Sequence, residues 1–267
     1  MIRVGVFGAG GKMGSTVCRA VHSDPDLELV AAVDPHHGGL EVSRVAGVVG
    51  NELLISRDAS GFGDVGVEVA VDFTEASAAR NNALWCARNQ IHAVVGTTGF
   101  SQADIDAFRT AFTSCNCLIA PNFAIGAILM MKFAELAAPY FDTAEIIEFH
   151  HENKVDAPSG TATLTAQRMA TASGEWVDDP TTSVVYDGAR GGVGPGGIRV
   201  HSVRMRGMVA HQEVLLGTTG QTLTIRHDSI DRTSFMPGVL MACKAVGDTP
   251  GVTVGLDTLL GISNLTL

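Results

Sequence analysis

The chain has few cysteines, few basic residues and no long apolar segment, and each shortage excludes a class of protein. Its five cysteines are odd in number and include no C-x-x-C pair, so they form neither a disulfide framework nor a zinc ribbon. We expect them to be buried free thiols. Eighteen Lys and Arg residues against 28 Asp and Glu residues give a net charge of −10, which repels phosphate backbones and anionic lipid. Nucleic acid is therefore not an expected partner.

The longest apolar stretch of the sequence runs from Phe123 to Met131 and ends at Lys132. It is far shorter than the ~20 residues that span a bilayer, so we expect no membrane partner. The first residues, MIRVGVFGAGG, lack the basic region, apolar core and cleavage site of a secretory signal, and the expected location is the cytoplasm. With 267 residues, of which 46% are apolar, the chain can bury a sizeable core in about two domains.

Strand-like and helix-like segments alternate through the first half of the sequence. The β-branched apolar run Ile2–Phe7 predicts a strand, a glycine cluster predicts a turn, and apolar residues at helical spacing over Lys12–His22 predict a helix. The other elements predicted in this half are strands at 27–33, 67–73, 91–95 and 117–120, a helix at 75–89, and a helix that follows an N-cap at Ser101. Such alternation predicts an α/β fold with a Rossmann-like, doubly wound parallel sheet.

The pattern changes after Asn122, and a second domain is expected to begin near residue 123. A long apolar helix over 125–141, a strand over 145–149 and a helix over about 160–171 come first. Segment 188–197 holds six glycines and one proline in ten residues, which indicates a mobile loop. Three strands at 199–206, 211–216 and 221–228, joined by short turns, predict an antiparallel meander. A helix over 235–246 follows, and periodicity does not assign the end of the chain to either domain.

A glycine-rich turn lies between the first strand and the first helix. It contains Gly8, Gly10, Gly11 and Gly14, and in a βαβ unit such a turn lets the backbone approach a pyrophosphate at the positive end of the helix dipole. Asp34 follows at the end of the second strand, where a carboxylate accepts hydrogen bonds from an adenosine ribose. Together these features predict a dinucleotide site. The alternative is a structural glycine turn with an ordinary Asp at a strand end.

Lys12 and Met13 bear on two further questions about this turn. A P-loop needs Ser or Thr after its lysine to hold magnesium, and Met13 stands there instead, so a P-loop is excluded. Lys12 is one of only four lysines in the chain. It either pairs with the cofactor's phosphates or nicotinamide end, or is a solvated lysine at a helix start, and residue type leaves both open.

The densest polar segment is EFHHENKVDAPSGT, residues 148–161, between a strand and a helix. Imidazoles pass protons near neutral pH, and a nearby lysine offers a positive charge and a second acid. His150, His151 and Lys154 therefore suit proton delivery to a carboxylated substrate. Because neighbouring residues on a strand point to opposite faces, both histidines share one site only if the strand has already ended.

Ser159, Gly160 and Thr161 are typical of an N-cap and first helical turn, which offers backbone N–H groups and two hydroxyls to an anion such as a substrate carboxylate. A surface turn with a capping serine is the alternative. A zinc site on His150 and His151 lacks the i, i+4 spacing and a third ligand, so no metal is expected. Ser159 is not expected to be a nucleophile because no G-x-S-x-G elbow surrounds it.

Four motifs taken together resemble one enzyme family over essentially the whole chain. They are Gly8-x-x-Gly11-x-x-Gly14, Gly96-Thr97-Thr98-Gly99, Ala120-Pro121-Asn122-Phe123 and His150-His151-x-x-Lys154-x-Asp156-Ala157-Pro158-Ser159-Gly160-Thr161. The combination is similar to that of the 4-hydroxy-tetrahydrodipicolinate reductases, also called dihydrodipicolinate reductases, and the last motif is the specific one. The piece Gly207-x-x-x-His211-x-x-Val214 agrees with the second domain of that family.

The resemblance implies NAD(P)H-dependent reduction of 4-hydroxy-tetrahydrodipicolinate, a small dicarboxylate, to tetrahydrodipicolinate in the diaminopimelate route to lysine. It implies a dinucleotide-binding domain formed by residues 1–122 and 232–267. A smaller α+β domain with a mixed sheet, residues 123–231, then binds substrate and forms a homotetramer. Hydride adds to a cyclic imine, and an acid such as His150 protonates the neighbouring ring carbon. Which residue delivers which proton is left open.

The resemblance also assigns residues to the site. His150 and Lys154 are the expected proton donors, and His151, Ser159, Gly160 and Thr161 are expected to hold substrate. The expected cofactor-binding residues are Gly8, Ala9, Gly10, Gly11, Lys12, Met13, Asp34, Gly96, Thr97, Thr98, Ala120, Pro121, Asn122, Phe123 and Arg232.

The residues after the second strand bear on the choice of cofactor. Some family members have Glu-Arg there, with the arginine available for a 2′-phosphate, whereas this chain has Asp34-Pro35-His36-His37. A bare carboxylate repels the phosphate, so NADH is expected to be favoured over NADPH, with Lys12 or the histidines partly offsetting this.

Two other functions compete with this interpretation. One is another two-domain nicotinamide dehydrogenase of amino-acid metabolism, such as a homoserine or aspartate dehydrogenase, which the motif over 156–161 argues against. The other is a non-catalytic NAD-binding regulator, which would have no use for His150, Lys154 and the Ser-Gly-Thr turn together.

Overall fold

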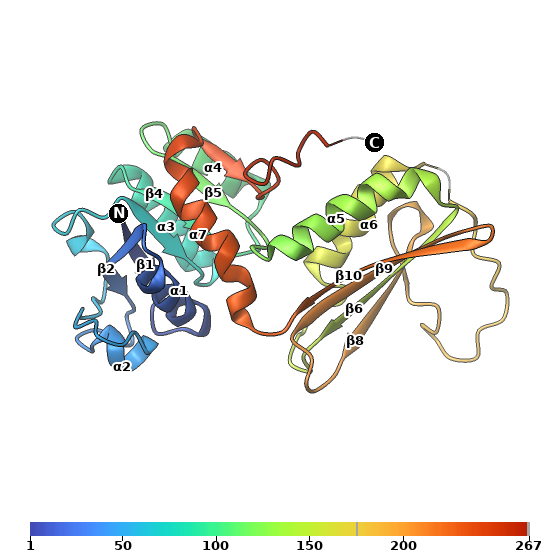
Figure 1. Cartoon of the computed structure of the whole chain (residues 1–267), viewed down its shortest axis with the longest axis horizontal. Coiled ribbons are helices and arrows are strands. Elements are labelled where there is room, and N and C mark those ends of the chain that lie inside the picture. The colour runs from blue at the N-terminus through green and yellow to red at the C-terminus, as the bar shows by residue number, and fades with distance from the viewer. Residues whose placement is uncertain (175, 266–267) are drawn as a thin grey trace. The chain divides into compact units, whose positions relative to one another are not determined.

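The computed structural model describes residues 1–174 and 176–265, which form two compact units (Figure 1). The first unit comprises Met1–Phe123 and Phe235–Gly261, and the second comprises Ala124–Ser234 with the residues from Ile262 on. The chain thus leaves the first unit after Phe123 and returns to it at Phe235. Across the described residues, no helix is both long and apolar enough to cross a membrane.

The first unit is built on a six-stranded parallel sheet in the order β11-β5-β4-β3-β1-β2. Its strands are β1 (Ile2–Phe7), β2 (Leu27–Val33), β3 (Val69–Asp72), β4 (His92–Val95), β5 (Cys117–Ile119) and β11 (Val252–Val254). Its α-helices are α1 (Lys12–Ser23), α2 (Val42–Ala46), α3 (Ala76–Arg88), α4 (Gln102–Ala111) and α7 (Met236–Ala245), with short 3-10 turns η1 (Ser60–Phe62) and η5 (Val246–Asp248). The predicted doubly wound parallel sheet is confirmed.

Local sequence explains these elements. The central strands carry β-branched residues that are buried on both faces, such as Val71 and Val94 on one face and Val95 on the other, which is the pattern of a parallel sheet covered on both sides. The predicted N-cap at Ser101 is confirmed: its side chain accepts from the Asp104 N–H, and the Asp104 carboxylate accepts from the Ser101 N–H at 2.9 Å.

The strand order places the ligand-binding edge of this sheet. The chain runs from β1 to its neighbour β2, and then crosses to β3 on the other side of β1. Where the direction of winding reverses, the carboxyl ends of β1 and β3 leave a crevice in which such folds bind ligands. The glycine-rich turn after Phe7 and the residues after Asp72 lie at this reversal.

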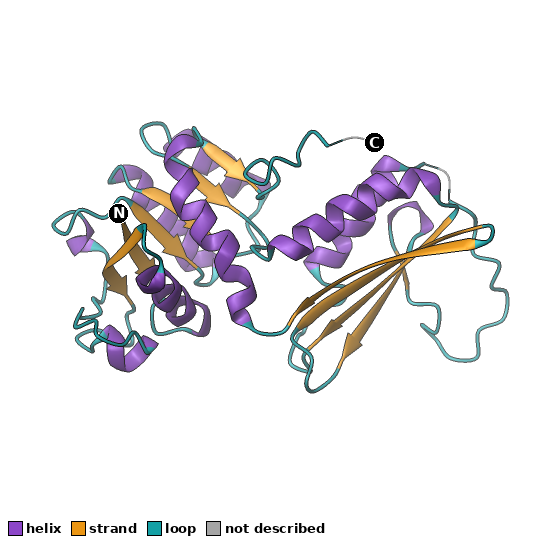
Figure 2. Ribbon diagram, viewed as in Figure 1, coloured by secondary structure: helices purple, strands orange, loops and turns teal. Residues whose placement is uncertain are grey.

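The second unit is built on a five-stranded mixed sheet in the order β10-β9-β6-β8-β7. Its strands are β6 (Thr143–His150), β7 (Gly192–Val193), β8 (Arg199–Arg204), β9 (Ala210–Thr218) and β10 (Gln221–Ser229). Helices α5 (Ile125–Ala137) and α6 (Gly160–Ala172) pack on each other and cover one face of this sheet (Figure 2). The 3-10 turns of this part are η2 (Ala138–Tyr140), η3 (Pro195–Gly197) and η4 (Arg232–Phe235).

The predicted meander of three consecutive antiparallel strands is wrong in one respect. β9 and β10 form the expected hairpin, but β6 lies between β9 and β8, antiparallel to β9 and parallel to β8. The reason is burial: Ile146 and Glu148 on β6 have no exposed surface, so this strand takes a central position. Arg204 at the end of β8 then pairs with Glu148 across the parallel ladder.

Other boundaries also differ from the expectation. The apolar helix predicted over 125–141 ends at Ala137, and Pro139 lies in η2, because proline lacks the N–H donor that a continuing helix needs. Segment 188–197, predicted as a loop, contains β7 and η3. The edge strand β11 was not predicted. The expected buried free thiols are confirmed for all five cysteines, and burial raises the pKa of Cys18 and Cys243 to about 12.

Candidate active site

The glycine-rich turn after β1 has a backbone that side chains would not permit. Gly8 has a φ of +67°, and a Cβ at Gly14 would lie 2.0 Å from the carbonyl oxygen of Gly8. The strand end and the first turn of α1 therefore approach each other more closely than alanine allows. Gly11 caps α1 without any side-chain hydrogen bond to the first-turn N–H groups. A tight turn with uncapped N–H groups at a helix start fits a pyrophosphate.

Asp34 ties the loop after β2 to this turn. Its side chain is only 9% exposed; Oδ2 accepts a 3.0 Å hydrogen bond from the Gly10 N–H, and Oδ1 accepts one of 2.9 Å from the His36 N–H. Nδ1 of His37 lies 2.9 Å from Oδ1. Burial raises the pKa of Asp34, but the contacts with His37, His36 and Gly10 outweigh it and bring the pKa below its ordinary value. Asp34 is therefore an ionised carboxylate whose acceptors are largely used within the protein.

A cavity of about 190 Å³ lies at the carboxyl ends of β3, β4 and β5. It is lined by Met13, Phe73, Gly96, Pro121, Asn122, Phe123 and Phe235. A Cβ at Gly96 would lie 2.0 Å from the Phe73 ring, so only glycine admits this ring, which lies 5.5 Å from that of Phe123. An aromatic cavity of this size suits a flat heterocycle, and it brings together five of the predicted cofactor-binding residues.

The residues after β3 were missed by the sequence reasoning. Asp72 is 3% exposed and accepts hydrogen bonds of 2.7 Å from the Thr74 N–H, the Thr74 hydroxyl and the Asn82 amide. The Thr74 carbonyl in turn accepts from the hydroxyl of Thr97 at 2.8 Å, which joins the loops after β3 and β4. Thr98, by contrast, is exposed. The signal that could have found this cluster is an acidic residue at a strand end, the same signal that singled out Asp34.

In the second unit, two of the predicted residues, His150 and Ser159, contact one buried carboxylate, Glu148. His150 Nδ1 lies 2.5 Å from its Oε2, the guanidinium of Arg204 donates to both oxygens at 2.8 Å, and the Ser159 N–H donates to Oε1 at 3.1 Å. Burial raises the pKa of Glu148, but hydrogen bonds from His150, Arg204 and Ser202 outweigh it and lower the pKa to about 2. An ionised carboxylate only accepts hydrogen bonds, so Nδ1 of His150 is assigned as the protonated donor in this contact. Nε2 is left for another partner.

The strand β6 ends at His150, so the two histidines are not held on opposite faces of a continuing strand. His151 lies beyond the strand and is exposed. Its carbonyl accepts from the Lys154 N–H at 3.1 Å, and the Lys154 ammonium lies 2.8 Å from Oδ1 of Asp156. The Asp156 carbonyl accepts from Arg204 at 2.6 Å. The pair of Glu148 and Arg204 therefore holds the following loop as well as His150.

Ser159 is the N-cap of α6, as predicted, and its Oγ accepts from the Ala162 N–H at 3.2 Å. The residue is 3% exposed, so its hydroxyl caps the helix and is not available at the protein surface. Gly160 is exposed and Thr161 is half-buried. Since Ser159 also donates to Glu148, the carboxylate that holds His150 fixes the start of α6 too.

Arg232 lies on η4 in the second unit, with its side chain exposed. Residues 1–174 and 176–265 contain no group of three or more His, Cys, Asp and Glu side chains arranged to hold a metal ion.

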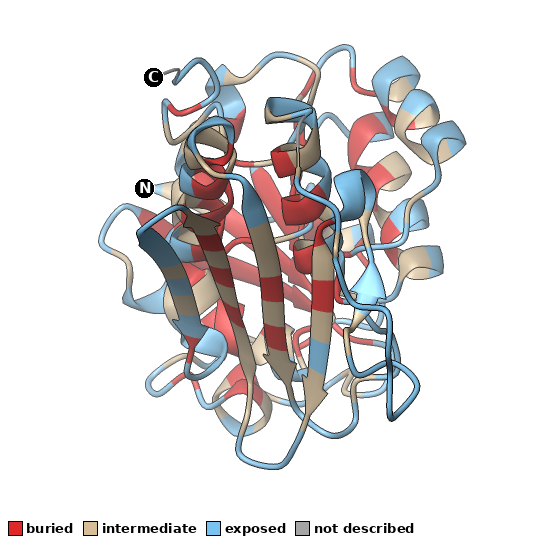
Figure 3. Ribbon diagram, turned by 90° about the vertical axis from the view of Figure 1, so that its right-hand side faces the viewer, coloured by how far each residue is buried: buried red, intermediate tan, exposed pale blue. Residues whose placement is uncertain are grey.

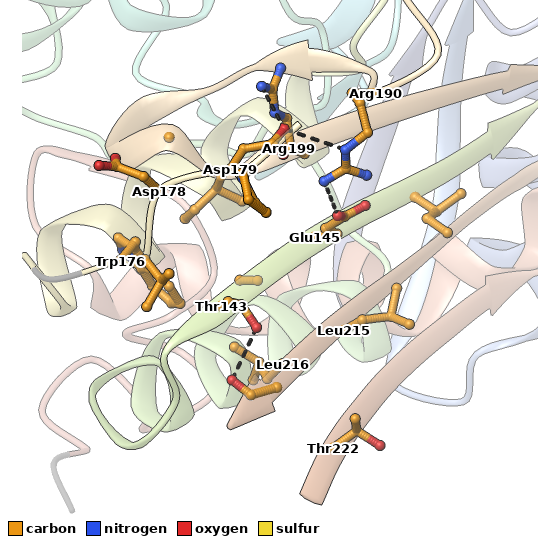
Figure 4. Close-up of a pocket in the computed structure, with 17 residues that line it drawn as sticks. Thr143, Glu145, Trp176, Asp178, Asp179, Arg190, Arg199, Leu215, Leu216 and Thr222 are labelled. Carbon is orange, nitrogen blue, oxygen red and sulfur yellow. Dashed lines mark hydrogen bonds and ion pairs between the residues drawn. The ribbon is translucent and has the colours of Figure 1, made fainter. Parts of the chain in front are cut away.

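A further pocket of about 340 Å³ is formed by β6, β8, β9 and the segment from Trp176 to Arg190 (Figure 4). Arg190 donates to Glu145 at 2.6 Å and to Asp179 at 3.3 Å, and Arg199 lies 2.7 Å from Asp179. None of the predicted site residues lines this pocket. Its two arginines pair with carboxylates of the same pocket, so their charges are satisfied by the protein itself.

Comparisons with family models, curated relatives and solved structures all indicate the same family. The model described as dihydrodipicolinate reductase, N-terminus, matches residues 2–123, and the model for the C-terminus matches residues 126–260. Curated 4-hydroxy-tetrahydrodipicolinate reductases from Nocardia farcinica and Cutibacterium acnes are each 50% identical to 98% of this chain and cover 99% and 100% of their own lengths. The solved structure of dipicolinate-bound dihydrodipicolinate reductase from Paenisporosarcina sp. TG-14 has a TM-score of 0.83 and 38% identity, over 97% of this chain and 99% of that one.

Proposed function

Because the chain belongs to the dihydrodipicolinate reductase family, we propose roles for its residues in the reaction of that family. The protein is a pyridine-nucleotide-dependent oxidoreductase that reduces 4-hydroxy-tetrahydrodipicolinate to tetrahydrodipicolinate in the diaminopimelate route to lysine. The observation that carries the assignment of residues is the buried Glu148, which holds both His150 and the start of α6.

The first unit is proposed to bind the cofactor. The turn over Gly8–Met13 meets the pyrophosphate, Asp34 lies toward the adenosine ribose, and the cavity beside Gly96 and Phe123 receives the nicotinamide. When bound, the reduced nicotinamide supplies a hydride. The proposed cofactor-binding residues of this unit are those over 8–13, Asp34, Gly96, Thr97, Thr98 and those over 120–123, with Phe73 added from the cavity lining. Arg232, which belongs to the second unit, is proposed as a further cofactor-binding residue.

The start of α6 is proposed to hold a carboxylate of the substrate. Gly160 and Thr161 form the first turn of this helix, where backbone N–H groups and the helix dipole favour an anion. Ser159 contributes by capping the helix, and His151, exposed directly after β6, is proposed to contribute a further donor. A relative that binds dipicolinate, a dicarboxylate, supports this choice of ligand.

His150 is proposed to deliver the proton from Nε2. Its Nδ1 is held by Glu148, so the ring can present only the opposite nitrogen to a substrate. After hydride addition, the ring carbon next to the new C–H bond needs a proton, and an acid fixed in one orientation delivers it faster than a rotating one. Lys154, held by Asp156, places a positive charge beside a dicarboxylate and is the second proposed acid.

NADH is proposed as the favoured cofactor and NADPH as a usable one. The support is the ionised Asp34, whose negative charge lies at the end of β2 where the adenosine ribose of a dinucleotide is expected.

A homotetramer is the proposed assembly. Helices α5 and α6 cover one face of the second unit's sheet, and along the central strands β6 and β9 buried positions alternate with half-buried ones that belong to the other face (Figure 3). Ile147, Phe149 and Leu215 give this face apolar surface, and Arg226 lies 5.5 Å over the Phe149 ring. Such a face is best covered by another copy. Light scattering should report a mass well above the 27.8 kDa monomer, and a stable monomer at micromolar concentration contradicts the proposal.

The location proposed for the enzyme is the cytoplasm, in keeping with its biosynthetic relatives. The activity is tested by coupling the protein to the upstream synthase, which makes the unstable substrate from pyruvate and aspartate semialdehyde. NADH absorbance should fall only when the synthase and both of its substrates are present. Oxidation that fails here but proceeds with an amino-acid dehydrogenase's substrates would contradict the assignment.

A further inference from the structure

A second cavity of the first unit lies next to the glycine-rich turn. It has a volume of about 460 Å³, and its lining includes Gly8 from that turn, Pro35 from the loop after β2 and Trp85 from α3. In a sheet of this order, the adenosine half of a dinucleotide lies beside the ends of β1 and β2. This cavity is therefore the place for the adenosine half, if the first unit binds the cofactor as proposed above.

Two arginines in the lining of this cavity lack partners. Within the described residues, the guanidinium groups of Arg57 and Arg88 have neither a hydrogen bond nor an ion pair, and both residues are exposed. Other arginines of the same unit are satisfied: Arg3 pairs with Glu28, and Arg80 pairs with Asp104. The cavity therefore presents positive charge that the protein does not use.

The carboxylates near this cavity do not neutralise that charge. Asp58 accepts hydrogen bonds from the N–H and hydroxyl of Ser60, and no ion pair joins it to either arginine. Asp34 is absent from the lining, and its oxygens face the Gly10 N–H, the His36 N–H and His37. A phosphate in the cavity would thus meet two unpaired cations against one lining carboxylate, Asp58, whose Oδ1 is already bonded to Ser60.

The backbone fixes Arg57 beside the end of β2. Ser56 forms a parallel bridge with Val33, and the Asp34 N–H donates to the Ser56 carbonyl at 2.9 Å. Arg57 then packs across the loop after β2, since a Cβ at Gly38 would lie 2.2 Å from Cγ of Arg57. The residue that directly follows Asp34 is an uncharged proline, so the cation comes from a segment more than twenty residues further along the chain.

We propose that Arg57 binds the 2′-phosphate of NADPH, with Arg88 contributing charge on the same cavity. Arg57 offers a planar set of N–H donors that matches a phosphate, and it lies where the 2′ position of the adenosine ribose is expected. This proposal rests on the proposed cofactor role of the first unit. It makes Arg57 a specificity-determining residue that offsets the negative charge of Asp34 and gives the enzyme its use of NADPH.

The test measures binding rather than turnover. Fluorescence titration gives the Kd of NADPH and of NADH for the wild type, Arg57→Met, Arg57→Lys and the control Arg44→Met. Arg44 is also an exposed arginine of this unit without a side-chain partner among the described residues, and it lies on α2 outside the cavity lining. Competition by 2′,5′-ADP and by 5′-AMP repeats the comparison without the nicotinamide half.

Arg57→Met should raise the Kd of NADPH and of 2′,5′-ADP by about tenfold to a hundredfold, which is the usual effect of losing hydrogen bonds between charged groups. The Kd values of NADH and 5′-AMP should change less than about twofold. Arg57→Lys should retain part of the affinity for NADPH, and Arg44→Met should match the wild type. Equal losses of affinity for NADPH and NADH, or no loss of affinity for either, would overturn the 2′-phosphate role. If the wild type binds neither dinucleotide, the proposed cofactor role of this unit fails, and the subsite fails with it.

Discussion

The ion pair between Glu148 and Arg204 makes a prediction about stability that the structure allows us to quantify. The pKa of Glu148 is about 2 in the folded chain against 4.5 for an ordinary glutamate. A tenfold change in an equilibrium constant is about 1.4 kcal/mol, so the charged form of this fully buried side chain stabilises the fold by roughly 3 kcal/mol. Glu148→Gln removes this contribution and leaves Arg204 without its carboxylate. We expect the free energy of unfolding at neutral pH to fall by about 3 kcal/mol.

The pH dependence of this effect has a definite sign. Because the pKa of Glu148 is lower in the folded chain than in the unfolded chain, its stabilisation is complete above pH 4.5 and is lost as the pH falls from there through about 2. Wild type and Glu148→Gln should therefore differ most at neutral pH and converge in acid. Urea denaturation followed by circular dichroism, near neutral pH and at about pH 3 and at one protein concentration, measures both differences.

Glu28→Gln is the matched control, in the sheet of the first unit. Glu28 also pairs with an arginine, Arg3, at 2.9 Å, but their side chains are 43% and 41% exposed. A pair of this kind contributes about 0–1 kcal/mol, so the control should lose little stability. A loss below about 1 kcal/mol for Glu148→Gln, or a loss as large in acid as at neutral pH, would refute the buried charged pair.

The same variant reports on catalysis. With an amide at position 148, His150 Nδ1 no longer faces an ionised acceptor, and small misplacements of a catalytic group cost about a hundredfold in rate. We expect kcat to fall by about tenfold to a hundredfold in the folded variant, with the Kd of NADH unchanged. Unchanged kcat would show that Glu148 supports the fold but does not position His150.

Three further changes test the site residues. Lys154→Ala should lower kcat by a factor of about 10²–10⁴ because an acid and a charge are lost, and Lys154→Gln should not restore it. A normal kcat with loss of NADH binding would show that Lys154 belongs to the cofactor site instead. Thr161→Val removes a hydroxyl bond to a charged group, worth about 1.5–3 kcal/mol, so substrate KM should rise with little change in kcat or in NADH affinity by fluorescence titration. A fall in kcat alone would contradict a binding role. Asp34→Ala should shift the ratio of kcat/KM for NADH to that for NADPH toward NADPH, and an unchanged ratio would refute Asp34 as the specificity carboxylate.

Features that depend on neighbouring residues could be predicted from the sequence. The turn with Gly8 and Gly14, the capping box at Ser101 and the N-cap at Ser159 each involve residues a few positions apart, and all three are confirmed as local structure. The alternation of buried strands and amphipathic helices likewise predicted the parallel sheet of the first unit.

Features that depend on distant residues could not be predicted in this way. The cavity that holds Phe73 against Gly96 joins the ends of two strands, and Arg57 lies beside Asp34 only because Ser56 bridges to β2. Periodicity describes each segment by itself, so it identifies a strand without its neighbours. The edge strand β11 was missed because three residues, Val-Thr-Val, are too short a run to be distinguished from a loop.

The strand order of the second sheet shows what a physical constraint adds to periodicity. Glu148 lies eleven residues before Ser159 and 56 residues before Arg204, and the predicted meander placed β8 beside β9 without assigning a neighbour to β6. A fully buried carboxylate without a guanidinium partner is strongly destabilising, so Glu148 requires β6 to lie next to the strand that carries Arg204. Inserting β6 between β8 and β9 brings Arg204 to Glu148 and keeps the hairpin of β9 and β10. The need to pair one buried charge therefore favours a strand order in which β6 lies beside β8, and the burial of Ile146 on β6 favours a central position for that strand.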